Sequence, residues 1–174
     1  MIIFDANILI TLATKHEQDE VYERISGLIQ DLVTTKTVIG IPSPALAEFL
    51  CGADIATSGI VDVMKRKSVM RVLPFDEAAA FETALIHRGA HALGKKRGAS
   101  KSPWQQVKID RQILAIARVH RVDTMYTDDD EMIAEAARLG INGIRSSELP
   151  LRPKQGLLNL REDLPGTDEG ASLD

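Results

Sequence analysis

A run of four acidic residues, Asp-Asp-Asp-Glu at 128–131, stands between an apolar segment at 124–126 and a helical pattern that follows it. Adjacent carboxylates repel one another, so such a run is tolerated in open solvent or around a bound cation. Helix capping explains it more simply, because an Asp N-cap and acids in the first turn complement the helix dipole. Which explanation holds depends on whether carboxylates from elsewhere in the chain gather beside this run.

Three other carboxylates stand next to predicted strands or helices. Asp5 directly follows the apolar residues 2–4, and Glu48 comes shortly after the apolar run 37–41. Asp110 precedes apolar residues at helical spacing. Each also has an ordinary explanation, since Asp is a favoured N-cap and a Glu on a helix usually faces solvent. Their joint placement is therefore more informative than any single acid.

Carboxylates that converge without basic partners raise one another's pKa values, and a divalent cation resolves that conflict. Oxygen ligands without a Cys or His cluster favour Mg²⁺ or Mn²⁺ over Zn²⁺. The rival is a zinc site at His87 and His91, which stand four residues apart. That pair lacks the intervening Glu of metalloproteases and an evident third ligand. Both histidines are therefore expected on a solvated helix face.

An α/β fold is predicted to position the acids, because apolar β-branched runs alternate with segments of helical periodicity. Strands are expected at residues 2–4, 37–41, 69–73, 124–126 and 141–144. Helices are expected at about 8–12, 21–32, 43–50, 55–66, 76–86, 110–121 and 131–139. Such alternation implies a mostly parallel sheet of four to five strands, covered by helices on both faces. Ligands bind at the carboxyl ends of such strands, where Asp5 and the run at 128–131 fall.

Composition indicates one domain with a single sizeable core, since the 174 residues are 44% hydrophobic and 26% charged. The formal charge of −4 gives no global basic field, so any contact with nucleic acid must come from a local patch. Cys51, the one cysteine, excludes an internal disulfide and is expected to be a small core residue. The sequence shows no signal peptide and no membrane span, which predicts a cytoplasmic protein.

Two segments depart from this periodic pattern. Residues 89–104 form an expected basic loop in which glycines and serines mix with Lys95, Lys96, Arg97 and Lys101. Residues 151–174 are expected to form an extended, disordered tail, because they are rich in charge, Pro and Gly. The folded domain is therefore expected at 1–150.

The chain resembles the PIN-domain family of metal-dependent ribonucleases, and within it the VapC-like toxins of type II toxin-antitoxin pairs. The resemblance lies in five motifs: IFDANILI at 3–10, ALAEFL at 45–50, VLPFDEAAA at 72–80, DRQILAIA at 110–117 and MYTDDDEM at 125–132. These motifs are weak individually and more specific in this order and spacing. The resemblance implies a PIN-like three-layer α/β/α sandwich. The long basic stretch and the extended tail depart from the compact toxins of the family.

The resemblance also assigns roles to individual residues. It implies that the metal-binding and catalytic carboxylates are Asp5, Glu48, Asp110 and Asp129, with Asp128 as the second choice for the last position and Glu131 as a supplementary acid. Asn7 and Thr127 would orient the ligands by hydrogen bonds. Bound Mg²⁺ or Mn²⁺ would lower the pKa of a water that attacks the scissile phosphate in line.

Contacts with RNA are expected from the basic loop and its surroundings. The candidate RNA-binding residues are Lys95, Lys96, Arg97, Lys101, Lys108 and Arg111, with Trp104 stacking on an unpaired base. The alternative is a solvated surface linker with Trp104 packed onto the core. The resemblance further implies three partners: an RNA substrate, a cognate antitoxin and a second copy of the chain in a homodimer.

Two other function classes remain open at this point. A phospho-acceptor signalling module also gathers acids around Mg²⁺, but it needs adjacent acids after the first strand and a late Lys. Here Phe4 precedes Asp5, and no Lys occurs between Lys108 and Lys154. The other class is a binding module that keeps the PIN fold without catalysis. Retention of all four carboxylates argues against it.

Overall fold

The computed structural model describes residues 1–14, 19–52, 69–92 and 102–151. Five strands and seven helical segments lie in these ranges. The strands are β1 (Ile2–Phe4), β2 (Ile39–Pro42), β3 (Met70–Leu73), β4 (Thr124–Tyr126) and β5 (Asn142–Ile144). The helices are α1 (Ala6–Thr14), α2 (Glu20–Thr34), α3 (Ser43–Gly52), α5 (Glu77–Ala92), α6 (Trp104–Val119), α7 (Asp130–Arg138) and the short 3₁₀ helix η1 (Ser146–Glu148).

The strands form one parallel sheet in the order β3-β2-β1-β4-β5. In the central pair, Ile2 lies beside Thr124 and Phe4 beside Tyr126. One residue farther on, the Asp5 amide donates to the Tyr126 carbonyl, with 3.1 Å between nitrogen and oxygen. This register brings the residues that follow β1 and β4 to the same edge of the sheet.

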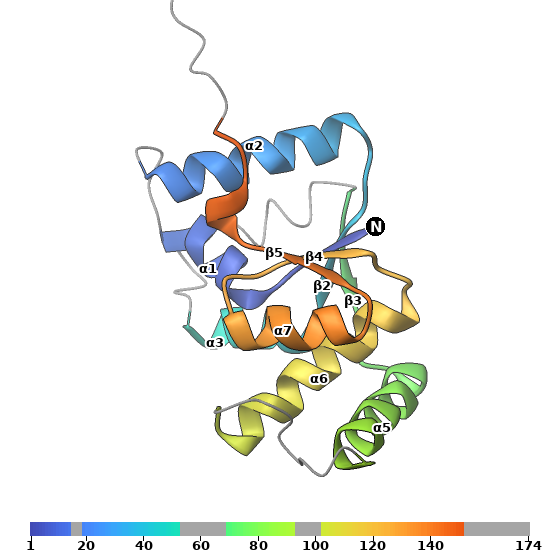
Figure 1. Ribbon diagram of the computed structural model, residues 1–174. Helices are drawn as coiled ribbons and strands as arrows, with labels where there is room; N and C mark the ends of the chain where they lie inside the picture. The colour runs from blue at the N-terminus through green and yellow to red at the C-terminus, as the bar shows by residue number, and fades with distance from the viewer. Residues whose placement is uncertain (15–18, 53–68, 93–101, 152–174) are drawn as a thin grey trace, which may run out of the picture.

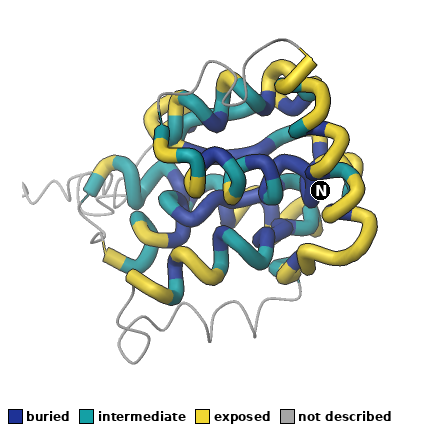
Figure 2. Tube along the Cα trace, turned by 90° about the horizontal axis from the view of Figure 1, so that it is seen from below, coloured by how far each residue is buried: buried dark blue, intermediate teal, exposed yellow. Residues whose placement is uncertain are grey.

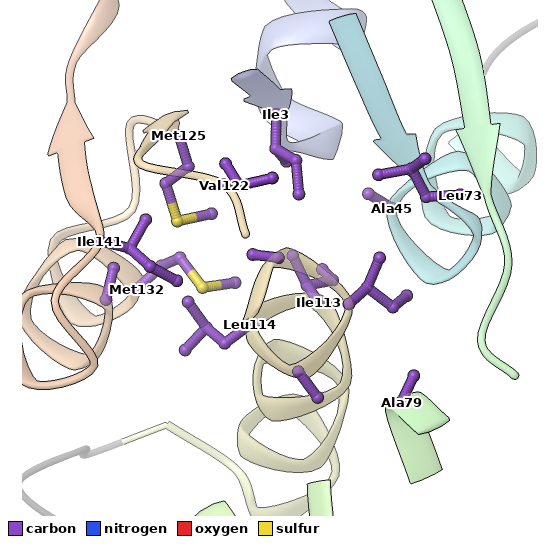
Figure 3. Packing of buried hydrophobic residues seen from close by; sticks show 14 of the residues in the cluster. Ile3, Ala45, Leu73, Ala79, Ile113, Leu114, Val122, Met125, Met132 and Ile141 are labelled. Carbon is purple, nitrogen blue, oxygen red and sulfur yellow. The ribbon is translucent and has the colours of Figure 1, made fainter. Parts of the chain in front are cut away.

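Helices cover both faces of the sheet, with α1 and α2 on one side and α5, α6 and α7 on the other (Figure 1). Side chains alternate along β1, so that Ile3 packs toward the α6 side and Phe4 toward the α1 side. Figure 3 shows the first of these cores, where Ile113 and Leu114 of α6 meet strand and α7 residues. Burial on both faces explains why the central strands are continuous apolar runs.

The expected fold class, a three-layer sandwich with a parallel sheet, is confirmed in the described residues. The strands lie within one or two residues of their predicted positions. Asp76 caps α5 as expected, since its Oδ1 accepts from the Ala79 amide at 2.9 Å. Gly140, the predicted stop of α7, has a φ of 76°, a backbone conformation that glycine adopts readily.

Three predictions about these segments were wrong. The helix expected to start at Asp110 begins at Trp104, so Asp110 lies inside α6 and is not its N-cap. Cys51 is exposed at the end of α3 and not a core residue. The basic loop was expected from Gly89, but α5 continues to Ala92. The expected helix at 55–66, residues 93–101 of the loop and the tail from 152 onward lie outside the described residues.

Buried segments run through the middle of the molecule, and exposed positions lie mainly on the outer surfaces of the helices (Figure 2). Within the described ranges, no helix is both long and apolar enough to cross a membrane.

Candidate active site

Four of the predicted acids, Asp5, Glu48, Asp110 and Asp129, line a single pocket with a volume of about 970 Å³. The pocket lies beyond the carboxyl ends of the central strands. Asp5 and Asp129 follow β1 and β4, while Glu48 and Asp110 project from α3 and α6. Helices α3 and α6 pack against each other, which brings their two acids to the same place.

Asp5 is the most constrained of the four, because its side chain is 6% exposed and accepts several hydrogen bonds. One carboxylate oxygen accepts from the Ala6 amide at 2.7 Å. The other accepts from the Thr127 hydroxyl at 2.7 Å and the Asn7 amide at 3.2 Å. These bonds fix the orientation of the carboxylate at the end of β1.

Thr127 and Asn7 join the ends of β1 and β4. The Asn7 side-chain amide also donates to the Thr127 hydroxyl at 3.0 Å, and its carbonyl oxygen accepts from the Asp128 amide at 3.2 Å. Thr127 is fully buried, and its hydroxyl accepts from the Asp129 amide at 3.2 Å. The two residues therefore hold Asp5 and the acidic turn in a fixed relation.

The structure separates Asp129 from Asp128. Asp129 is the N-cap of α7, where its Oδ1 accepts from the amides of Glu131 and Met132 at 2.7 and 3.0 Å. Neither bond uses its Oδ2, and Asp129 lines the pocket. Asp128 does not line it. Both its carboxylate oxygens accept from Ser146 at the start of η1, at 2.8 Å.

Burial and mutual repulsion shift the acids toward their neutral forms. Burial is the largest cause of a rise in the pKa of Asp110 to about 7, and repulsion by Asp129, Asp5 and Glu48 supplies part of the same rise. Burial likewise raises the pKa of Asp5, although its bonds to Thr127 and Ala6 oppose the rise. Glu48 also has a raised pKa, through burial and then repulsion by Asp5 and Asp129.

These side chains supply only oxygen donors, and none of the described residues that line the pocket is basic. A divalent cation fits such a donor set, because it relieves the repulsion that raises the pKa values. The side chains are not drawn together around one point: no group of three His, Cys, Asp or Glu in the described ranges is placed to hold an ion. The supplementary acid Glu131 accepts from the Ser102 amide at 3.4 Å.

The predicted RNA-binding residues divide into three sets: those outside the described residues, the pair Lys108 and Trp104 on α6, and the buried Arg111. Lys95, Lys96, Arg97 and Lys101 lie outside the described residues. Lys108 is half-buried on α6, with its ammonium nitrogen 6.0 Å from the centroid of the Trp104 ring. Trp104 packs onto the protein, since its ring centroid lies 5.4 Å from that of His87.

The prediction that Arg111 contacts RNA was wrong, because its side chain is 2% exposed. Its guanidinium lies 2.6 Å from Nδ1 of His87 and 4.0 Å from the carboxylate of Glu135. This arginine joins α5, α6 and α7. His87 is likewise packed against neighbours and not on a solvated face, and burial followed by the Arg111 charge lowers its pKa.

The sequence did not point to the rest of the pocket wall. The lining residues that were not predicted include Ile10, Pro44, Ala47, Cys51, Gln105, Gln106, Ile109 and Gln112. One signal was available in the sequence: Ile109 directly precedes Asp110 and Ala47 directly precedes Glu48, so apolar side chains were to be expected beside these acids.

A family model described as PIN domain matches residues 2–139. The fold is similar to that of VapBC2 from Rickettsia felis bound to a promoter DNA fragment, with a TM-score of 0.56 and 17% identity over 83% of this chain and 98% of that one. DNA-bound VapBC from Salmonella typhimurium also has a TM-score of 0.56, with 21% identity over 83% and 97% of the two chains.

A third similar structure is Mycobacterium tuberculosis VapC20, a toxin that cleaves the sarcin-ricin loop, with a TM-score of 0.49 and 16% identity over 77% of this chain and 94% of that chain. The comparison with curated proteins gave no match. The family match spans most of the chain and includes all four pocket acids. This protein therefore belongs to the PIN domain family.

Proposed function

We propose that this chain is a metal-dependent endoribonuclease that hydrolyses RNA phosphodiester bonds, and that it acts as the toxin of a toxin-antitoxin pair. The observation that carries the proposal is the convergence of Asp5, Glu48, Asp110 and Asp129 on one pocket, with no basic side chain among its described lining residues. Contacts to a helix N-terminus account for Asp129 and for the bond of Asp5 to the Ala6 amide, but not for Glu48 and Asp110, which lie inside α3 and α6. A shared ligand accounts for all four.

The four acids would hold one or two Mg²⁺ or Mn²⁺ ions, with Glu131 as a supplementary ligand. Asp128 is not among the proposed ligands, because both its oxygens bind Ser146. An ion in such a site lowers the pKa of a bound water and neutralises charge on a phosphodiester. The chain's own contribution is orientation: Thr127 and Asn7 fix the Asp5 carboxylate.

The acidic pocket repels RNA unless a cation and nearby basic groups offset its charge. We assign the backbone contacts to Lys95, Lys96, Arg97, Lys101 and Lys108. Trp104 would contribute through packing, since His87 and Lys108 already adjoin its ring.

The partners follow from the family and from the VapBC structures that resemble this fold. We propose that residues 1–150 form the nuclease domain, that a cognate antitoxin neutralises it, and that two copies form a homodimer in the cytoplasm. The mass of the purified chain in solution, measured by light scattering, tests the dimer.

The test of function is cleavage of single-stranded RNA and a tRNA pool with Mg²⁺, Mn²⁺ or EDTA. The wild-type protein should cut with either metal and not in EDTA. Asp5→Asn should lower the rate by about 100-fold or more, because it removes a charge that the reaction needs. The matched control is Asp123→Asn, an exposed acid just before β4 at the opposite edge of the sheet, which should cut normally.

A folded, partner-free protein that cuts nothing with any metal would contradict the proposal. A binding module without catalysis would then be the better account of the same fold.

A further inference from the structure

The pocket that holds the four acids also has an apolar flank, which consists of Ile10, Pro44, Ala47, Cys51 and Ile109. Two of these are large branched side chains that remain partly in solvent. Ile10 is 36% exposed and Ile109 is 40% exposed. Apolar surface gathered in a groove, unlike scattered surface residues, marks a place where a ligand is bound.

The apolar flank adjoins the acids along its length. Ala47 directly precedes Glu48 on α3, and Ile109 directly precedes Asp110 on α6. Ile10 lies one turn after Asn7 on α1. Whatever group binds against the flank is therefore next to whatever binds at the carboxylates.

Phosphate and ribose gain little from contact with isoleucine, whereas the face of a nucleobase is apolar and is commonly held between aromatic or aliphatic side chains. Three glutamines of α6, Gln105, Gln106 and Gln112, line the same pocket. Their side-chain amides both donate and accept hydrogen bonds, as the edge of a base requires. The volume of about 970 Å³ is at the upper end for small-ligand sites, which leaves room for a base beside a phosphate.

We propose that the apolar flank seats one nucleobase next to the scissile phosphate, with Ile10 and Ile109 against the base and the glutamines at its edge. The inference rests on the proposed ribonuclease function. A base inside a duplex is stacked on both faces, so only an unpaired nucleotide can enter. Cleavage is therefore expected at unpaired positions, and the flank takes the stacking role first expected of Trp104.

The first experiment measures binding of two labelled oligomers in EDTA, by fluorescence anisotropy. One is a short oligouridylate and the other is an abasic ribose-phosphate oligomer of equal length and charge. The wild-type protein should bind the oligouridylate more tightly. The double variant Ile10→Ala/Ile109→Ala should lose about five- to tenfold in affinity for oligouridylate and nothing for the abasic oligomer.

The matched control is Phe81→Ala/Leu85→Ala, which removes two apolar side chains of α5 that are 67% and 59% exposed and do not line the pocket. It should bind both oligomers as the wild type does. Equal wild-type affinity for the two oligomers, or an equal loss for both in the flank variant, would overturn the inference and assign the flank to another occupant, such as a protein segment.

The second experiment needs no substitution, because Cys51 is the one cysteine of the chain and belongs to the flank. Oligouridylate should slow the alkylation of Cys51 severalfold more than the abasic oligomer does. Equal protection by the two oligomers contradicts the inference.

The two proposals can fail separately. If the protein binds oligouridylate more tightly than the abasic oligomer but cuts no RNA with any metal, the ribonuclease proposal fails and the proposed nucleobase site on the apolar flank stands. Cleavage of RNA together with equal affinity for the two oligomers overturns the proposed nucleobase site alone.

Discussion

Asp110 lies on α6 among three other acids of the pocket, and its pKa of about 7 is well above the ordinary value of 3.8. Between these two values the folded protein binds more protons than the unfolded chain. Stability must then fall as pH rises through this window, since ionisation places another charge among like charges. Asp5 and Glu48 have raised pKa values as well and add to the same slope.

The first prediction concerns Asp110→Asn in the absence of metal. The wild-type protein in EDTA should be less stable to urea at pH 8 than at pH 5. The variant should show a smaller decline and be more stable than wild type at pH 8 by roughly 1–2 kcal/mol, after allowance for solvent screening. Mg²⁺ should stabilise the wild type more at pH 8 than at pH 5, because ligands must be ionised to bind it. If the stability of Asp110→Asn fell between pH 5 and pH 8 as much as that of the control variant Asp123→Asn, this account would be contradicted.

The two neighbouring acids Asp128 and Asp129 allow a second prediction. Asp129→Asn keeps a good N-cap for α7 but removes the charge, so it should fold normally and lose about 100-fold in RNA cleavage. Asp128→Ala removes the acceptor for Ser146 and should cost about 1–2 kcal/mol of stability. Its cleavage rate per folded molecule should stay within about threefold of wild type. Urea unfolding and cleavage rates measure both effects, and the opposite pattern would make Asp128 the ligand.

Among the secondary-structure elements, those with local signals were predictable. The strands β1 and β4 are buried on both faces and therefore appear as unbroken apolar runs, which also located Asp5 and the acidic turn. The start of α6 was missed, because Pro103 and the basic stretch before it resemble a loop. Yet Val107 is buried on the same helix. In the first turns of α6, Val107 is the one buried apolar residue before Ile113, so the apolar spacing that marks a helix starts only near Asp110.

Contacts between helices were not predictable from sequence. The burial of Arg111 depends on His87 of α5 and Glu135 of α7, which lie on either side of it in the fold and far from it in sequence. For the same reason, the sequence did not show that Asp128 binds Ser146. In both cases the sequence identified a charged residue as a candidate for the site, but its role depends on a partner from another element that the sequence does not reveal.

The third prediction tests the link that Arg111 makes among three helices. Arg111→Ala should destabilise the protein by roughly 2–4 kcal/mol, because it leaves a cavity and removes the cation beside Glu135. The salt dependence of RNA binding should be unchanged, since the side chain does not reach solvent. Lys108→Ala, three residues earlier on α6, is the control and should be nearly neutral in stability while weakening RNA binding. A stable Arg111→Ala variant with a smaller salt slope would restore Arg111 as a contact to RNA.

For the molecule as a whole, a net charge of −4 and an acidic pocket oppose the approach of RNA. Under the proposed ribonuclease function, local basic residues supply the attraction. Lys95, Lys96 and Arg97 precede Pro103, which lines the pocket, by six to eight residues in the sequence. That position in the chain makes these three residues the first choice for contacts to the phosphates flanking the cleaved bond.

The fourth prediction is that replacing Lys95, Lys96 and Arg97 by Ala lowers the slope of log affinity against log salt by about 2 for single-stranded RNA, because each neutralised phosphate contributes about 0.7. The matched control replaces Lys36, Arg121 and Arg138, which precede β2, β4 and β5 at the opposite edge of the sheet. Both triple variants change the net charge equally. An equal loss of slope would mean that RNA responds to total charge alone, whereas a loss confined to the first variant assigns the backbone contacts to Lys95, Lys96 and Arg97.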